Sequence, residues 1–422
     1  MRRSHWLAIF MSGCALAAAE TPPPVRWAVQ RVSGPGTTAG FPNIEGVEHF
    51  ELMRVTSQTG TYSHHSHILH DGSRFFTTWS NHRRDEDGPG QRVLFAISTD
   101  GRQWSDPAEC FPPLGPPERT GEQASLVLTA NGLHQVDGTV YAVAGINGLG
   151  PRRFGSRPCY GNVARSIALD GSLGGMFMLA GEQPPPLEGF EHDIAPPGDE
   201  RFVALAAEMV TQRHRPDQCP SWSFRPAGPG HEDYAVGTGS WKSFGHRMLA
   251  ADGHRVCEPT SYRRPDGVAV RLFRDLNGSR REYAAVFDEA TQTWSALQRT
   301  NIPDSSSRAV AGRLPDGGVY LVGNQTWAAL EGRGDRDPLV LSTSRDGVTF
   351  DRAWIIRAGS QAMRHRGLHK GPGFQYPHAT VVGDDLWVIY SINKEDVAVS
   401  RVPLQAVLSK TATKNEGTGV VR

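Results

Sequence analysis

The chain has 422 residues, and its 44 Lys and Arg are balanced by 44 Asp and Glu, so the formal net charge at pH 7 is zero. Such a balance lacks the basic footprint of a nucleic-acid-binding protein. Gly (47) and Pro (30) are abundant and no low-complexity linker divides the sequence. These features favour one large all-β domain over the two or three domains that the length alone suggests.

The first residues are expected to form an export signal. A basic start at Arg2 and Arg3 precedes an apolar run over 6–18 and small residues at 17–19. The run is shorter than the roughly 20 residues of a membrane span, and no later stretch is long and apolar enough to span. A buried N-terminal helix is disfavoured by the prolines at 22–24. Cys14 offers an alternative, a lipid anchor.

We therefore expect a signal peptide over 1–19, a β-propeller over 25–410 and a flexible tail over 411–422. The protein is expected to be secreted or periplasmic, or anchored at the outer membrane through Cys14. An exported protein with Cys110, Cys159, Cys219 and Cys257 has room for one or two disulfides. The wide spacing matches no zinc motif, and the pairing stays open.

One pattern recurs along the chain: an apolar strand, a turn with Asp and usually Gly, and a second apolar strand. Six such turns stand 50 to 68 residues apart, at Asp71, Asp137, Asp199, Asp266, Asp316 and Asp384. Asp-Gly between apolar strands is a strong hairpin signal, and units of this length are typical of propeller blades. A seventh blade is expected within 232–250, or from an N-terminal strand at 27–32 that pairs with the C-terminal strand. A β-sandwich is the weaker alternative.

A second motif, Ser-x-Asp-Gly-x-x-aromatic, occurs at 98–104 and 344–350, with a degenerate copy at 288–294. In such a turn the Asp side chain accepts hydrogen bonds from backbone N–H groups, and Gly takes the positive φ. We expect these aspartates to be structural and to lie at outer turns, away from the central channel.

The densest polar stretch, 62–68, opens the first repeat. Strand alternation places His65 and His67 on one face and His64 on the other. Imidazoles at a channel mouth suit proton transfer near neutral pH. The His-x-His pattern would alternatively bind a metal, and a single His would alternatively bond to backbone between blades.

Polar groups at the ends of other repeat strands extend this pocket. Gln91 and Arg92 end a loop opposite the histidines, where Arg92 would pair with a substrate carboxylate or with the acidic cluster 85–87. Arg274 has the adjacent Asp275 as an alternative partner. The remaining candidates at strand ends are His134, Glu258, Arg308, Tyr376 and His378.

These motifs resemble a group of sialidase-like propellers. The segments that carry the resemblance are 64–104, 272–275, 301–305, 336–342, 375–378 and 390–396. The group includes the seven-bladed α-L-rhamnosidases of glycoside hydrolase family 145 and the propeller lyases of polysaccharide lyase families 25 and 42. Those enzymes act on acidic polysaccharides, at rhamnose–glucuronate linkages or in ulvan. The resemblance spans about 62–403 and is least clear over 159–253.

The resemblance implies roles for several residues. Hydrolases of the group use a channel His, which His65 would match, with Arg92 beside it. The lyases use a His and a Tyr with a cation that neutralises the uronate carboxylate, for which His134, Tyr376 and Arg274 are the candidates. True sialidases need an arginine triad and an early Arg-Ile-Pro motif. This chain has no such early motif; the segment 262–265 is only superficially similar.

We expect a polysaccharide lyase, because elimination needs a base, an acid and charge neutralisation, whereas a conventional glycosidase needs two carboxylates. A rhamnosidase-type hydrolase and a non-catalytic glycan-binding propeller stay as alternatives. The expected partner is an acidic polysaccharide. We expect no required cofactor, although a structural metal is compatible with the sequence, and a monomer. The assigned catalytic residues are His65, His134, Tyr376 and Arg92, and the assigned substrate-binding residues are His64, His67, Gln91, Glu258, Arg274, Arg308 and His378.

Overall fold

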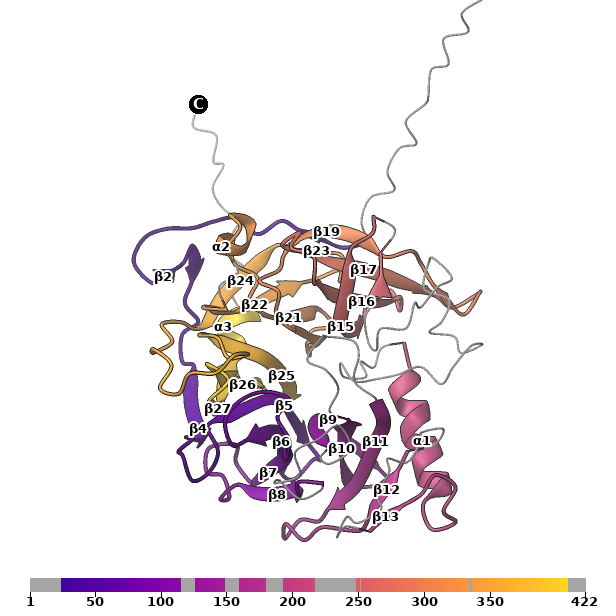
Figure 1. Cartoon of the computed structure of the whole chain (residues 1–422). Helices are drawn as coiled ribbons and strands as arrows, with labels where there is room; N and C mark the ends of the chain where they lie inside the picture. Colours follow the sequence, from indigo (N-terminus) through magenta and orange to yellow (C-terminus); the bar gives the residue numbers. More distant parts are fainter. Residues whose placement is uncertain are drawn as a thin grey trace, which may run out of the picture.

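The computed structural model describes residues 24–114, 126–148, 159–179, 193–216, 248–250, 252–333 and 336–408. These residues form an all-β propeller of five sheets, or blades, whose innermost strands surround a common centre (Figure 1). Neighbouring innermost strands contact one another in the order β9, β5, β25, β20 and β15, which are defined below.

The five blades are built as follows. The first contains β5 (Tyr62–His70), β6 (Phe75–His82), β7 (Arg92–Ser98) and β8 (Ala108–Phe111). The second contains β9 (Val127–Val136), β10 (Thr139–Asn147), β11 (Cys159–Ile167), β12 (Met176–Met178) and β13 (Ile194–Ala195). The third contains β14 (Met248–Leu249), β15 (Arg255–Arg263), β16 (Ala269–Asp275), β17 (Arg281–Asp288), β18 (Thr293–Trp294) and β19 (Gln298–Pro303). The fourth contains β20 (Val310–Arg313), β21 (Val319–Gly323), β22 (Leu339–Ser344) and β24 (Arg352–Arg357). The fifth contains β25 (Phe374–Val382), β26 (Asp385–Ile392), β27 (Asp396–Pro403) and β4 (Glu48–Met53).

Short elements decorate the blades. The strands among them are β1 (Arg26–Trp27), β2 (Thr37–Thr38), β3 (Phe41–Pro42) and β23 (Thr349–Phe350). The helices are α1 (Val203–His214), α2 (Trp327–Leu330) and α3 (Gln405–Leu408).

The fifth blade joins both ends of the domain. The N-terminal strand β4 pairs with the C-terminal strand β27, with Phe50 opposite Val399, so the predicted pairing of terminal strands in one blade is confirmed. The predicted strand at 27–32 does not provide it, because Arg26–Trp27 pairs in parallel with β23 instead. The described residues form five blades, and the prediction of seven or six is not met within them. Most of 232–250, the other candidate for a further blade, lies outside the described residues.

The turn at Asp199 leads into a helix and not into the predicted strand. The sequence of α1, VALAAEMVTQRH, is rich in good helix formers. Helical spacing places Ala206 and Met209 on one buried face, and Phe202 stacks on Phe177 of the second blade at a centroid distance of 4.5 Å. Packing of this apolar face decides the local structure, because the short window also reads as a strand.

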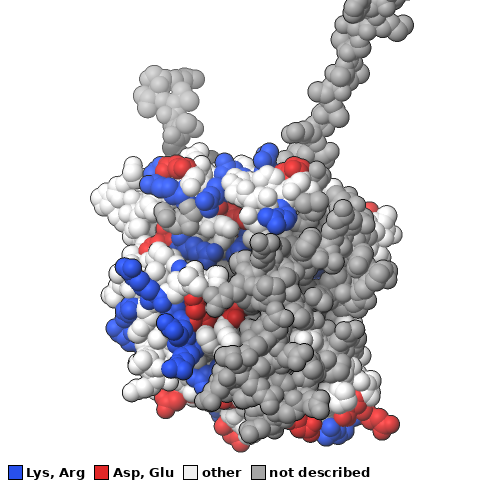
Figure 2. Space-filling view, viewed as in Figure 1, with Lys and Arg blue, Asp and Glu red and all other residues white. Residues whose placement is uncertain are grey.

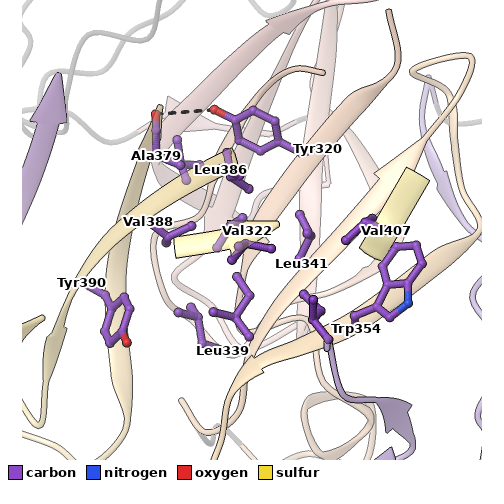
Figure 3. Packing of buried hydrophobic residues seen from close by; sticks show 14 of the residues in the cluster. Tyr320, Val322, Leu339, Leu341, Trp354, Ala379, Leu386, Val388, Tyr390 and Val407 are labelled. Atoms are coloured by element: carbon purple, nitrogen blue, oxygen red, sulfur yellow. Dashed lines mark hydrogen bonds between the residues drawn. The ribbon is translucent and has the colours of Figure 1, made fainter. Parts of the chain in front are cut away.

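Apolar side chains fill the space between neighbouring blades. Figure 3 shows one such cluster, where side chains of β21 and β22 meet those of β26, and the Tyr320 hydroxyl lies 3.5 Å from the Ala379 carbonyl. Leu339, Leu341 and Val388 are fully buried there. Burial of each such side chain contributes roughly 1.5–3 kcal/mol. The inter-blade core thus fixes the angle between the innermost strands.

The Ser-x-Asp-Gly-x-x-aromatic turns are structural, as predicted. In the first, Asp100 accepts hydrogen bonds from the backbone N–H groups of Arg102 and Gln103, both at 2.8 Å, and the Trp104 indole donates to the Gly101 carbonyl. Asp346 accepts equivalent bonds in the second turn. Both turns connect the third and fourth strands of a blade, at its outer side.

We predict that Gly101→Ala destabilises the protein by about 2–4 kcal/mol, because a Cβ at this position would lie 2.5 Å from the buried Trp387 ring. The matched control is Gly138→Ala, whose φ of +78° is close to the +72° of Gly101 but whose Cβ would meet nothing within 4 Å. Urea unfolding of both variants measures the difference. Equal losses of stability would show that backbone strain alone governs Gly101.

Several predictions concern residues outside the described part of the chain: the signal peptide at 1–19, the lipid anchor at Cys14, Cys219 and the tail at 411–422. Within the described part, Cys110 and Cys257 are both buried, and no disulfide joins them to each other. No described helix is long and apolar enough to cross a membrane.

Candidate active site

The candidate site is built on backbone irregularities in the innermost strands. Three innermost strands, β5, β15 and β25, each show a register shift against the next strand, as a β-bulge does. The first residue within the shift is His65 in β5, Glu258 in β15 and Tyr376 in β25. All three residues have a positive φ, of 54°, 51° and 54°. Such a conformation costs a non-glycine residue of order 1–3 kcal/mol, and bulges of this kind redirect side chains at active sites. The strain therefore makes these three positions candidates for a functional site.

Tyr376 and Glu258 meet across the centre of the propeller. The Tyr376 hydroxyl donates a 2.8 Å hydrogen bond to Glu258 Oε1, and Arg274 Nη1 donates to the same hydroxyl oxygen at 2.5 Å. Arg274 also lies 2.8 Å from Glu258 Oε2, an ion pair of which both side chains are about nine-tenths buried. The hydroxyl thus has a carboxylate placed to accept its proton and a cation placed to stabilise the oxyanion that would form.

Arg336 is a second guanidinium at Tyr376. Its carbon Cζ lies 5.5 Å from the centroid of the Tyr376 ring, and that of Arg274 lies at 5.8 Å. Arg336 is held by Gln375 Oε1 at 2.5 Å and by the Ser306 carbonyl at 2.7 Å, and no described carboxylate forms an ion pair with it. Its charge is therefore available to an anionic group bound beside Tyr376.

His65 faces the same ring from the neighbouring blade. Its Nε2 atom lies 3.3 Å from Glu86 Oε1, and its ring centroid is 5.4 Å from that of Tyr376. Lys394 Nζ lies 2.5 Å from the other Glu86 oxygen. His64 packs on Tyr376 at a centroid distance of 4.0 Å and shares a 2.7 Å hydrogen bond with Ser391 Oγ. An imidazole–carboxylate pair therefore stands beside the tyrosine.

Burial and neighbouring charges set the protonation states. Burial raises the pKa of Tyr376 well above its usual value, although Arg274 and Arg336 oppose this effect. For Glu86, burial acts to raise the pKa, but Lys394 and His65 outweigh it and hold the pKa well below the usual range. Burial, with the charges of Lys394 and His65, lowers the pKa of His64. The resting site thus holds a neutral tyrosine, an ionised Glu86 and a neutral His64.

A second group of predicted residues includes His67 and His378, which lie two residues after His65 in β5 and Tyr376 in β25. His67 and His378 face each other at a centroid distance of 5.1 Å, and the Ile68 N–H donates to His378 Nδ1 at 3.3 Å. Burial and the nearby charge of Arg308 lower the pKa of His378 to about 3. The structure thus places His67, His378 and Arg308 together. We call these three residues the second buried layer, next to the residues around Tyr376.

Three predicted residues are placed elsewhere. Gln91 links the first two blades through Leu128, to whose carbonyl it donates at 2.8 Å. Arg92 binds Asn81, the Thr59 carbonyl and Glu109, and neither His65 nor the acidic cluster 85–87 is among these partners. His134 pairs with Tyr141 in the strand ladder, past the bulge of β9.

Glu86, Lys394 and Arg336 were missed by the sequence reasoning. Glu86 and Lys394 lie in turns that connect the strands of their blades, and Arg336 lies between α2 and β22. None of them lies within a repeat strand, so the strand pattern does not single them out. Arg274 lies in this cluster, with Glu258 as its ion partner and not Asp275, which binds His254.

His64, His65 and Glu86 each offer a metal-ligand atom, and these atoms lie within 4.8 Å of one another. The Nδ1 atoms of His64 and His65 lie next to Ser391 Oγ and Ser80 Oγ, an arrangement typical of metal-binding imidazoles. However, the Lys394 ammonium already neutralises Glu86, and a divalent cation would be repelled by it. The residue set therefore fits proton transfer better than metal binding.

Comparisons with known proteins agree with this architecture. A BNR repeat-like domain model matches residues 235–410, and a model of a BT_1020-like N-terminal beta propeller matches 33–138. A search of curated proteins finds no significant match.

Among solved structures, one described as a sialidase matches with a TM-score of 0.66 and 22% identity, over 90% of this chain and 35% of that one. The Trypanosoma rangeli sialidase with the inhibitor DANA matches with a TM-score of 0.52 and 11% identity, over 87% of this chain and 61% of that one. The same enzyme with 2,3-difluorosialic acid, a covalent intermediate, has a TM-score of 0.52 and 10% identity, over 87% and 60%. This chain thus spans about a third to three fifths of the length of these enzymes. It has a sialidase-like β-propeller fold with BNR repeats.

Proposed function

We propose that this protein is a retaining glycoside hydrolase that cleaves the bond between a carboxylate-bearing sugar and its leaving group, with Tyr376 as the nucleophile. The observation that carries this proposal is the buried Tyr376–Glu258 hydrogen bond beside two guanidinium groups. Arg336 and Arg274 would bind the sugar carboxylate. A tyrosine is suited to attack next to that carboxylate, because a carboxylate nucleophile would be repelled by it.

In the first step, the Tyr376 oxygen bonds to the anomeric carbon and its proton passes to Glu258. The bond from the anomeric carbon to the leaving oxygen breaks, and that oxygen takes a proton from the His65–Glu86 pair. In the second step, a water molecule attacks the same carbon, gives a proton to the His65–Glu86 pair and releases Tyr376, which regains its proton from Glu258. Both steps balance in atoms and protons, and two inversions retain the configuration.

An elimination mechanism receives less support. It would use His134, Tyr376 and Arg274, and His134 lies past the bulge of β9, opposite Tyr141 in the strand ladder. Tyr376 instead has a carboxylate as its proton acceptor, which is the arrangement of an activated nucleophile. We therefore propose hydrolysis in place of the lyase reaction expected from the sequence.

The test is a panel of aryl glycosides of sialic acid, other 2-keto sugar acids and uronic acids. We expect release of the aryl alcohol from at least one acid-bearing glycoside, and no release from the neutral glycoside of the same skeleton. The configuration of the first-formed product, measured by NMR, should be retained. Formation of an unsaturated sugar acid would instead establish a lyase, and inversion would exclude the tyrosine nucleophile.

We further predict that the reaction needs no metal, because Lys394 provides the cation for Glu86. Dialysis against EDTA should leave kcat/KM unchanged within about twofold, and added Zn²⁺ should inhibit if it captures His64 and His65. A loss of activity on dialysis that Zn²⁺ restores would contradict this prediction. Metal content by mass spectrometry of the dialysed protein is the control.

A further inference from the structure

The loop between β24 and β25 lies beside the candidate site. The backbone N–H groups of Arg364 and His365 donate to the buried Glu395 carboxylate, at 3.1 and 2.6 Å. The backbone N–H groups of Leu368 and His369 donate to Asp85, the latter at 3.3 Å. Glu395 and Asp85 are the chain neighbours of Lys394 and Glu86, the ion pair of the site. The loop is thus held at two points next to the site.

A third contact extends this loop to Arg83 and Arg84. Lys370 Nζ donates to the Thr61 carbonyl at 2.5 Å, and the Thr61 hydroxyl donates to the carbonyls of Arg83 and Arg84 at 3.1 and 3.3 Å. We define the rim as residues 83–84 together with 364–370. Its two segments come from opposite ends of the sequence and form one continuous surface.

The exposed charge of the rim is positive. Arg83, Arg84 and Arg366 are exposed, and no described carboxylate forms an ion pair with them. The acids nearby are already used: Asp85 and Glu395 accept backbone N–H groups, and Asp396 pairs with Arg364. Figure 2 shows Lys and Arg side chains gathered on the side of the molecule where Figure 1 places this loop. The acids thus hold the backbone while the cations face solvent.

The rim also presents an apolar contact. Leu368 is 77% exposed, the highest value among the large hydrophobic residues of the described chain. A leucine between cations offers a surface for the apolar face of a sugar ring, and the cations offer pairing to carboxylates along a chain.

We propose that the rim binds further units of an anionic, carboxylate-bearing polysaccharide whose terminal sugar acid occupies the Tyr376 site; this inference rests on the proposed hydrolase function. The position of the rim next to the His65–Glu86 pair, which donates to the leaving oxygen, places these units on the leaving-group side. The substrate is therefore a polyanion, and an isolated terminal sugar acid would use only part of the binding surface.

The test measures binding in the full chain carrying Tyr376→Phe, so that no turnover occurs. The probes are polygalacturonate and its fully methyl-esterified, neutral form. We expect polygalacturonate to bind, more weakly as salt rises, and the ester not to bind. Arg84→Ala/Arg366→Ala should weaken binding by at least about fivefold. The matched control is Arg299→Ala/Arg345→Ala, which removes two exposed arginines from other blades and should change binding less than twofold.

Equal weakening of binding by both double variants, or no binding of polygalacturonate, would overturn the proposal that the rim binds an anionic polysaccharide. Binding to phosphatidylserine vesicles without binding to polygalacturonate would also overturn it, in favour of a membrane surface. In the active protein, Arg84→Ala/Arg366→Ala should leave kcat/KM on a small aryl glycoside unchanged. If rim binding is found and no aryl glycoside is cleaved, the proposed hydrolase function fails while the rim stands. If an aryl glycoside is cleaved but polygalacturonate does not bind, the hydrolase function stands and the proposed role of the rim fails.

Discussion

Tyr376→Phe should lower kcat/KM on the best aryl glycoside by about 10³-fold or more, because it removes the oxygen that bonds to the anomeric carbon. The fold should survive. Without the hydroxyl, Glu258 Oε2 and Arg274 still lie 2.8 Å apart, so no buried charge loses its ion partner. The loss of two buried hydrogen bonds, one to Glu258 and one from Arg274, costs about 2–4 kcal/mol. Steady-state kinetics and thermal unfolding of the same preparation measure both effects.

A fluorinated glycosyl fluoride of the sugar acid makes this prediction specific. It should form a stable adduct with the unmodified protein, and peptide mass spectrometry should place the added mass on Tyr376. His378→Gln is the matched control, because His378 lies in the second buried layer and not at Tyr376. It should keep its labelling. If Tyr376→Phe retains more than a tenth of the activity, or if another residue carries the adduct, the nucleophile is misassigned.

Most of the architecture could be predicted from the sequence, because the patterns that indicate blades are local. Asp-containing turns and alternating strands predict blades wherever the hairpin chemistry is intact, as at Asp71 and Asp316. Asp199 fails as a blade marker because the apolar residues after it also satisfy a helix, and packing on Phe177 selects that helix. The number of blades depends on how segments close around the ring, which no local signal encodes.

Only part of the candidate site could be predicted from the sequence. Tyr376, Glu258 and Arg274 were singled out because each stands near a strand end, but their mutual pairing depends on three bulges with positive φ. Side chains at such bulges depart from simple alternation, so a strand pattern cannot predict which of them meet. Arg336 reaches the site from the connection between β21 and β22 and not from a repeat strand, which explains its omission.

The buried ion pair between Arg274 and Glu258 supports a second prediction, a large loss of stability when its cation is removed. Arg274→Met should destabilise the protein by about 3–5 kcal/mol, because it leaves the Glu258 carboxylate buried without its cation. Burial acts to lower the pKa of Arg274, but Glu258 and Tyr376 outweigh it and raise the pKa well above the usual value, so the guanidinium stays charged. Urea unfolding measures the loss. Activity should also fall, since the sugar carboxylate and the Tyr376 oxyanion both lose a cation.

The double variant Arg274→Met/Glu258→Gln separates the two causes. Removal of both charges takes away the desolvation penalty, so most of the lost stability should return, whereas activity should stay at least about 10³-fold below normal because the proton acceptor is also gone. Arg401→Met is the matched control: Arg401 pairs with Glu48 and Asp385, but its side chain is 27% exposed, so solvent limits the cost to about 1 kcal/mol or less. If the double variant recovers activity along with stability, the pair is scaffold and Tyr376 needs another base. If the double variant is as unstable as Arg274→Met, the uncompensated charge of Glu258 is not the cause of the instability.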